Sequence, residues 1–74
     1  MKLSPKEQDV LTLIACGFTD KEIGIKLKIS KGTVHTHVEN IFDKLRAKTR
    51  GHAVSLYINL NPKWKREERY LKTV

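Results

Sequence analysis

The middle of the chain carries polar side chains at spacings that place them on one side of a helix, opposite an apolar stripe. The polar residues are Lys31, His35, Thr36 and Glu39. The apolar residues are Val34, Val38, Ile41 and Leu45. Ammonium, imidazole, hydroxyl and carboxylate groups can hydrogen-bond to base edges, and an α-helix fits the major groove of a DNA duplex. The pattern predicts a helix that reads bases through His35, Thr36 and Glu39, with Lys31 near the groove edge.

The pair His35 and His37 also suggests a metal site, because histidine is a common metal ligand. On a helix, however, side chains two positions apart point about 200° away from each other, so one ion cannot easily bind both. Cys16 is the one cysteine, and no set of Cys and His residues has the spacing of a zinc site. We therefore expect no metal, and we expect Cys16 to be a reduced core residue.

Residues that could act as nucleophiles or acids in an enzyme have structural explanations instead. Ser4 with Glu7 and Thr19 with Glu22 each have the spacing of a capping box at a helix start. We expect Glu7 or Glu22 also to pair with a cation such as Arg50, as a structural ion pair. The sequence therefore predicts no enzyme and no cofactor.

The caps divide the chain into helices. The first helix starts after Ser4 and ends at Gly17, because glycine readily adopts the left-handed backbone that stops a helix. The second starts after Thr19 and the third after Ser30, with only two or three residues between them. Such a short joint is typical of a helix-turn-helix motif. Gly24, in the second helix, predicts the close approach of another helix.

A fourth helix is expected to start near Thr49 or Arg50 and to stop before Pro62. Its apolar residues cover an arc of roughly 200°, whereas one core-facing stripe needs only about 100°. The excess apolar surface predicts a second copy of the chain as a partner. The expected interface residues are Ala53, Leu56, Tyr57 and Leu60. The fold class is therefore all-α: a compact four-helix bundle with a helix-turn-helix in its second and third helices and a fourth helix for dimerisation.

The 74 residues form one domain with a thin core. The formal net charge is +7, and residues 31–61 carry five Lys or Arg against two Asp or Glu. This excess suits a polyanion, although charge for solubility explains it as well. We expect the domain to span residues 1–61. The basic tail, 62–74, is either a short helix or a solvated end, and its Trp64 and Tyr70 either stack on bases or cover the open end of the core.

The sequence lacks an apolar run long enough for a membrane helix, and its N-terminus lacks the apolar core of a signal peptide. It also has no internal repeat and no low-complexity segment. We therefore expect a cytoplasmic protein without a membrane partner.

Several segments resemble the LuxR/GerE helix-turn-helix family of bacterial transcription regulators. The resemblance lies in residues 27–37 (LKISKGTVHTH), in residues 3–11 (LSPKEQDVL) with Gly17, and in residues 21–23 (KEI). Lys44-Leu45, Arg50 and Ala53-Val54 also fit. The match runs without a gap from residue 3 to about residue 60. Together these spacings are specific, whereas any one of them alone would be weak.

The resemblance implies a compact four-helix domain of the winged-helix-like superfamily, whose third helix enters the major groove and whose fourth helix pairs two subunits. It also implies phosphate-side or orienting roles for Thr33, His37, Lys44 and Arg50. We expect a sequence-specific duplex-DNA-binding regulator that binds inverted repeats as a homodimer, with pairing stabilised on DNA and RNA polymerase as a further candidate partner. Because Met1 lies almost at the first helix, the chain resembles the stand-alone members, which lack a regulatory domain.

The sequence departs from the family pattern at three positions. Gly24 replaces the usual alanine, His35 stands where members often have Lys or Arg, and Glu39 stands where some have a basic residue. A familiar target site therefore cannot be carried over. Two alternatives stay open: a protein-binding adaptor or anti-regulator with the same fold, and a promoter-recognition fragment that resembles sigma region 4.

Overall fold

The computed structural model describes residues 3–60, which form four α-helices and, within this range, no strands. The helices are α1 (Pro5–Ala15), α2 (Asp20–Leu27), α3 (Lys31–Leu45) and α4 (Arg50–Leu60). The expected all-α fold is confirmed. Three residues separate α2 from α3, as the helix-turn-helix prediction requires. The predicted tail at 62–74, with Trp64 and Tyr70, lies outside the described residues.

Two capping boxes start α1 and α2, as predicted. The N–H of Ser4 donates to Glu7 Oε1 at 2.8 Å, and the N–H of Glu7 donates to Ser4 Oγ at 3.2 Å. At α2, the N–H of Thr19 donates to Glu22 Oε1 at 2.9 Å, and the N–H of Glu22 donates to Thr19 Oγ1 at 3.2 Å. Each box satisfies backbone donors that a helix start leaves without partners.

Single hydroxyl caps start the other two helices. Ser30 Oγ accepts the N–H of Thr33 at 3.0 Å at the start of α3. Thr49 Oγ1 accepts the N–H of His52 at 3.0 Å, which places the start of α4 at Arg50, as expected. The side chain of His52 also takes part, because its Nδ1 accepts the N–H of Lys48 at 3.1 Å. The bond leaves the proton of this imidazole on Nε2 when the ring is neutral.

Left-handed residues end the helices, but only one of them is the expected glycine. Gly17 follows α1 with φ +91°. Lys28 and Arg46 end α2 and α3 with φ values of 59° and 54°. A left-handed conformation costs a non-glycine residue roughly 1–2 kcal/mol. Compensating bonds close both ends: the N–H after Lys28 donates to Gly24 O at 2.9 Å, and the N–H after Arg46 donates to a carbonyl of the last turn of α3 at 3.0 Å.

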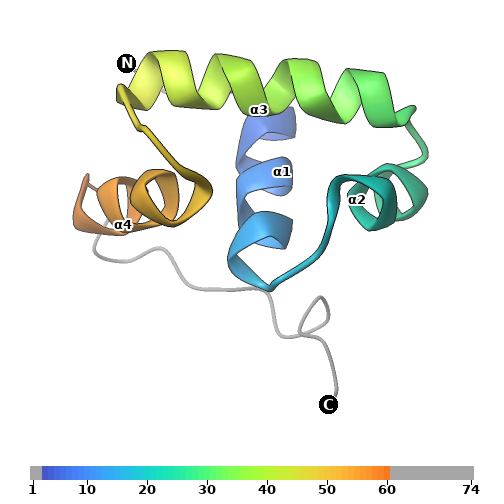
Figure 1. Ribbon diagram of the computed structural model, residues 1–74, viewed down its shortest axis with the longest axis horizontal. Helices are drawn as coiled ribbons and strands as arrows, with labels where there is room; N and C mark the ends of the chain where they lie inside the picture. The colour runs from blue at the N-terminus through green and yellow to red at the C-terminus, as the bar shows by residue number, and fades with distance from the viewer. Residues whose placement is uncertain (1–2, 61–74) are drawn as a thin grey trace.

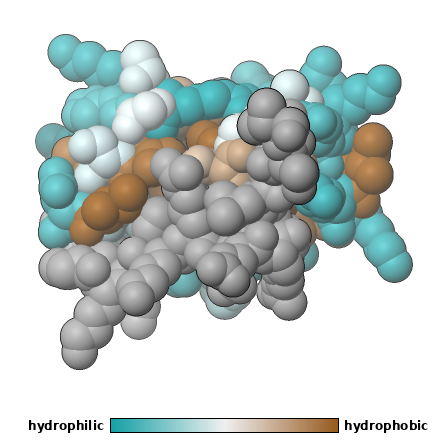
Figure 2. Space-filling model, turned by 90° about the horizontal axis from the view of Figure 1, so that it is seen from below, coloured by the Kyte–Doolittle hydropathy of each residue, from teal (hydrophilic) through white to brown (hydrophobic). Residues whose placement is uncertain are grey.

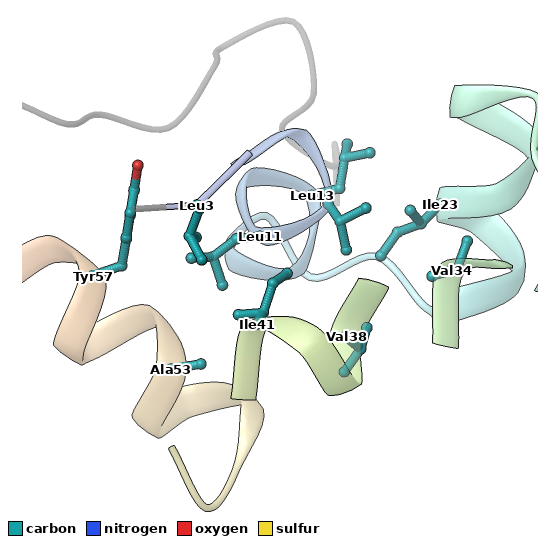
Figure 3. Close-up of a cluster of buried hydrophobic side chains, with 10 residues drawn as sticks. Leu3, Leu11, Leu13, Ile23, Val34, Val38, Ile41, Ala53 and Tyr57 are labelled. Carbon is teal, nitrogen blue, oxygen red and sulfur yellow. The ribbon is translucent and has the colours of Figure 1, made fainter. Parts of the chain in front are cut away.

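The core is a single cluster of apolar side chains drawn from all four helices (Figure 3). Its fully buried large members are Val10, Leu11, Leu13, Ile23, Val34 and Ile41. The apolar stripe of α3 faces this cluster as predicted, with Leu45 half-buried at its end. Cys16 is a buried free cysteine, also as expected. This one cluster fixes the orientation of α3 relative to the rest of the domain.

Gly24 permits the close approach of α3, as predicted, and also of the turn before it: a Cβ added at Gly24 would lie 3.6 Å from Val34 Cγ2 on α3. The same Cβ would lie 2.7 Å from the carbonyl oxygen of Ile29 and 3.7 Å from the backbone nitrogen of Lys31. The distance of 2.7 Å is far inside van der Waals contact. The absence of a side chain at position 24 is therefore what lets the short turn fold back so tightly over α2.

The arrangement of the helices leaves one side of α3 open. Figure 1 shows α3 along one edge of the molecule, with α1, α2 and α4 all on the same side of it. α3 packs against each of these three helices, and α1 lies between α2 and α4. The opposite side of α3 therefore faces away from the remainder of the described domain.

Candidate nucleic-acid interface

The predicted base-reading residues lie together on the open side of α3. Lys31, His35, Thr36 and Glu39 are all exposed, whereas Val34, Val38 and Ile41 are buried. The division follows from the helical repeat, because the buried stripe takes one side of α3 and leaves the polar residues on the other. The open face of α3 therefore carries hydrogen-bond donors and acceptors, and an α-helix fits into the major groove of a DNA duplex.

His35 and Glu39 form a pair on this face. His35 Nε2 lies 3.3 Å from Glu39 Oε1, at the i, i+4 spacing that brings side chains together on a helix. The two side chains remain 66% and 67% exposed. A ligand would therefore meet a combined imidazole and carboxylate rather than two independent groups. The sequence placed both residues on this face but did not predict their contact.

Thr36 uses its hydroxyl proton within its own helix. Its Oγ1 donates to the carbonyl oxygen of Gly32 at 3.1 Å. The groups of Thr36 that remain available to a ligand are its methyl group and the oxygen, which can still accept a hydrogen bond. A methyl group at this position is suited to contact with the methyl group of thymine.

The residues to which the resemblance gave phosphate-side or orienting roles do not share one environment. Thr33 is exposed, and its hydroxyl lies 2.8 Å from Ser30 Oγ within the cap of α3. His37 is half-buried at the side of α3. Lys44 and Arg50 each have an acidic partner inside the domain. Only Thr33 of the four is therefore fully open on the described surface.

Lys44 is held by a carboxylate of α1. Its Nζ lies 2.7 Å from Glu7 Oε1, and the Glu7 side chain is almost completely buried. Burial by itself raises the pKa of this carboxyl, but the hydrogen bonds from Lys44 and Ser4 and the charge of Lys44 outweigh it. The pKa of Glu7 therefore lies below its ordinary value, and the pair ties α3 to α1.

Arg50 is held by a carboxylate of α2. Its Nη2 donates to Asp20 Oδ1, which joins the first turn of α4 to the first turn of α2. The sequence predicted a structural ion pair of Glu7 or Glu22 with a cation such as Arg50. The structure confirms that Glu7 forms an ion pair, but its partner is Lys44. Arg50 forms an ion pair with Asp20 instead.

Several exposed polar residues around α3 were absent from the sequence prediction. Asn40 lies on α3 four positions after Thr36 and is exposed, so helical spacing alone could have indicated it. Exposed cations also lie at both ends of α3. Besides the predicted Lys31, they are Lys28 before its start and Arg46 and Lys48 after its end. Lys28 and Arg46 were missed because they lie at left-handed helix ends that the sequence did not indicate.

Part of the apolar arc of α4 packs into the core of the same chain. Ala53 and Tyr57 are buried there, and burial raises the pKa of the Tyr57 phenol. Leu56 is half-buried, Ile58 is 39% exposed, and the side chain of Leu60 lies outside the described residues. Figure 2, which views the side opposite α3, shows hydrophobic surface at the ends where α4 and α2 lie. Two of the four expected interface residues, Ala53 and Tyr57, are therefore buried in the core of their own chain.

Residues 3–60 contain no group of three or more His, Cys, Asp or Glu that could bind a metal ion. Within the same range, none of the helices has the length and hydropathy needed to cross a membrane.

Known proteins share this domain. Residues 1–57 match the family described as bacterial regulatory proteins, luxR family. The chain is 44% identical over 59 residues to the transcriptional regulatory protein LiaR of Bacillus subtilis, and this match covers 80% of the chain and 28% of LiaR. It is 40% identical over 52 residues to the nitrate/nitrite response regulator protein NarL of Escherichia coli, covering 70% of the chain and 24% of NarL.

A third relative is the uncharacterized transcriptional regulatory protein YhcZ of Bacillus subtilis, which is 43% identical over 60 residues. That match covers 81% of the chain and 28% of YhcZ. The chain therefore spans only 24–28% of the length of these three relatives. Because the family match covers residues 1–57 of the 74, this chain belongs to the LuxR family of bacterial regulatory proteins, which are DNA-binding transcription regulators and not enzymes.

Proposed function

We propose that this domain binds duplex DNA in a sequence-specific manner by inserting α3 into the major groove. The observation that supports the proposal is the placement of α1, α2 and α4 on one side of α3, with Lys31, His35, Thr36 and Glu39 exposed on the other. In this proposal His35 and Glu39 read adjacent bases as a pair. Glu39 accepts a hydrogen bond from a cytosine amino group, and Thr36 packs its methyl group against thymine.

Cations at the two ends of α3 contact the phosphates on either side of the groove in this proposal. Lys28 lies just before α3, and Arg46 and Lys48 follow its end, whereas Lys31 in the first turn stays with the base-reading residues near the groove edge. Contacts of this kind fix the register of a protein on DNA and make binding sensitive to salt. Thr33 and His37 remain phosphate-side candidates, as the resemblance implies.

Lys44 and Arg50 act as orienting residues in the same proposal. Each joins two helices through an ion pair, α1 with α3 and α2 with α4. An α3 held at a fixed angle to its neighbours loses less conformational freedom when it binds DNA. We therefore assign Lys44 to positioning the reading helix directly, and Arg50 to holding together α2 and α4, which both pack against it, rather than to direct phosphate contact.

Dimerisation through α4 completes the proposed function. Among the described side chains of α4, Leu56 is half-buried and Ile58 is exposed, and neither belongs to the core cluster. A small contact of this kind holds two chains together firmly only when both are bound to the same DNA site. Two copies related by a twofold axis place their reading helices in successive major grooves, about 34–36 Å apart, so the target is an inverted repeat. The proposed setting is the cytoplasm, where RNA polymerase is a further candidate partner.

A binding measurement on random duplex DNA, followed by selection of preferred sites, tests the proposal. We expect binding at low salt that weakens steeply as salt rises, because each phosphate contact releases a counterion. Selection is expected to enrich an inverted repeat. A chain that binds no duplex at low salt would refute the proposal and favour the adaptor alternative, and an enriched site without twofold symmetry would refute the dimer.

A further inference from the structure

The carboxylate of Glu39 determines which nitrogen of the His35 imidazole carries the proton when the ring is neutral. His35 Nε2 lies 3.3 Å from Glu39 Oε1. A neutral imidazole has one N–H and one acceptor nitrogen, and an ionised carboxylate has acceptor oxygens only. An unprotonated Nε2 at this distance would place two lone pairs against each other. The contact therefore favours the proton on Nε2, and His35 Nδ1 is then an acceptor.

Three positions on the open side of α3 thus offer acceptors to a ligand. The side chains of His35 and Glu39 are 66% and 67% exposed, so the ring and the carboxylate are accessible beyond their mutual contact. Thr36 lies between them in the sequence and donates its hydroxyl proton to the carbonyl oxygen of Gly32 at 3.1 Å. Its side chain retains an acceptor oxygen and a methyl group.

The base edges of the major groove differ in whether they supply the donors that such acceptors require. Cytosine N4 and adenine N6 are amino donors, whereas guanine O6 and N7 and thymine O4 are acceptors. Each base pair carries one amino group in this groove, so an acceptor distinguishes the strand on which the amino base lies. An acceptor opposite guanine or thymine leaves two lone pairs facing each other without a proton between them, which costs free energy.

We infer that His35 and Glu39 select an amino base, cytosine or adenine, at each of two neighbouring positions, and that His35 does so as an acceptor through Nδ1. The inference rests on the proposed DNA binding, and it makes Glu39 a positioning residue for His35 as well as a base reader. The two residues are about 6 Å apart along the helix, and base pairs stack about 3.4 Å apart, so the pair spans no more than two base-pair steps. Lys31 and Asn40, also exposed on α3, supply donors for other positions.

The contact makes the two residues unequal in their effect on specificity. Without Glu39, the proton of the His35 ring can move from Nε2 to Nδ1, and a protonated Nδ1 can donate to guanine. We therefore expect Glu39→Ala to relax the choice of base at two positions, its own and that of His35. His35→Ala is expected to relax one position and to leave the preference of Glu39 in place.

The test measures affinity for the duplex that selection returns, cut to a single half-site so that pairing of two chains plays no part. It is made at pH 8.5, above the range in which histidine gains its second proton. Every base pair is replaced in turn by the other three. At the two positions that Glu39→Ala relaxes, we expect reversal of the base pair to weaken binding of the unmodified chain about tenfold. Analogues of these bases that lack the exocyclic amino group should also lose about tenfold.

Exchange of cytosine for adenine on the same strand keeps the amino donor, so it should cost about threefold or less. Asp43→Ala is the matched control variant. It removes the same charge from an exposed position of α3 one turn after Glu39, and it leaves the contact between His35 and Glu39 in place. We expect Asp43→Ala to change the affinity for all duplexes alike and to keep the base preference of the unmodified chain.

Nitrogen chemical shifts of the His35 ring provide a measurement without DNA, and we expect them to place the proton on Nε2 in the free chain at the same pH. A proton on Nδ1 would overturn the inference. So would a preference for guanine or thymine at the position that His35→Ala relaxes, full binding of the analogues without an amino group, or relaxation of only one position in Glu39→Ala. Failure of the proposed function is a separate result, because the unmodified chain would then bind no duplex at low salt.

Discussion

Lys44 and Ser4 donate to the same oxygen of Glu7. Lys44 Nζ lies 2.7 Å from Glu7 Oε1, and the backbone nitrogen of Ser4 lies 2.8 Å from it. One carboxylate therefore closes the cap of α1 and anchors the last turn of α3, although Lys44 follows Glu7 by 37 positions. This shared oxygen links a local helix start to the tertiary position of the reading helix.

The first prediction concerns Glu7→Gln. The variant keeps an oxygen for the cap but loses the charge that pairs with Lys44, so we expect the free energy of unfolding at pH 7 to fall by about 1–3 kcal/mol. The folded-state pKa of Glu7 is lowered, so its contribution is full above the ordinary glutamate pKa. It is lost as the pH falls through the lowered value. Urea unfolding at pH 7 and at pH 3 measures both effects.

Glu22→Gln is the control for that experiment, because it makes the same change in the second capping box and leaves the Glu7–Lys44 pair in place. We expect Glu22→Gln to retain the acid sensitivity of the unmodified chain, and Glu7→Gln to have a flatter dependence on pH. Identical pH profiles for all three proteins would contradict the assigned role of Glu7.

The second prediction concerns Gly24→Ala. The added Cβ would meet the carbonyl oxygen of Ile29 at 2.7 Å, and a backbone atom cannot rotate out of the way. We expect a loss of about 1–3 kcal/mol in the free energy of unfolding, the usual range for overpacking. Thermal unfolding followed by circular dichroism measures it, with Gly51→Ala, whose added Cβ would meet no described atom within 4 Å, as the unstrained comparison. Equal melting temperatures would show that the turn between α2 and α3 adapts without loss.

The third prediction separates the two parts of the Thr36 side chain. Thr36→Val keeps a methyl group and removes the hydroxyl that donates to Gly32, whereas Thr36→Ser keeps the hydroxyl and removes the methyl group. If the methyl group makes the contact, Thr36→Ser loses about fivefold in affinity for the selected duplex, and Thr36→Val loses little. Fluorescence anisotropy on that duplex measures both. The reverse order would assign the contact to the hydroxyl.

The fourth prediction concerns the proposed pairing of α4. Leu56→Asp puts a charge into the half-buried apolar surface of α4, at a cost of several kcal/mol if it is buried unpaired in an interface. We expect a folded chain that binds single half-sites normally and full sites without cooperativity. Gel-shift titrations on the two duplexes measure the difference.

Ile25→Asp is the matched change for that prediction, because Ile25 lies on α2 and is 69% exposed. It adds the same charge far from the proposed interface, so cooperativity should survive. Unfolding of Leu56→Asp would place Leu56 in the core of its own chain, and normal cooperativity would refute pairing through this residue.

The fifth prediction concerns the left-handed end of α2. Lys28 has φ 59°, a conformation that glycine adopts without the penalty of about 1–2 kcal/mol that other residues meet. We expect Lys28→Gly to raise the free energy of unfolding by up to about 1 kcal/mol. The same variant should lower duplex affinity and the slope of its salt dependence, because one exposed cation is lost. A change in stability without any change in that slope would remove Lys28 from the phosphate contacts.

Local sequence patterns determined the elements of this domain. Capping boxes join residues only three positions apart, so Ser4 with Glu7 and Thr19 with Glu22 could be identified before any packing was known. The apolar stripe of α3 is likewise a property of helical spacing, and it determined which residues of that helix face outward. The family and its helix-turn-helix were readable for the same reason: their signals lie within short segments.

The tertiary structure decided the contacts between distant segments. The ion pairs Glu7–Lys44 and Asp20–Arg50 depend on the angles at which helices cross, which spacing along the chain does not specify. The broad apolar arc of α4 indicated that much of this helix is buried. It did not indicate which of its residues pack into the core of the same chain. The packed core took Ala53 and Tyr57, and left Leu56 half-buried. Helical periodicity is a property of neighbours in the chain, whereas the choice of partner requires the three-dimensional packing of the whole domain.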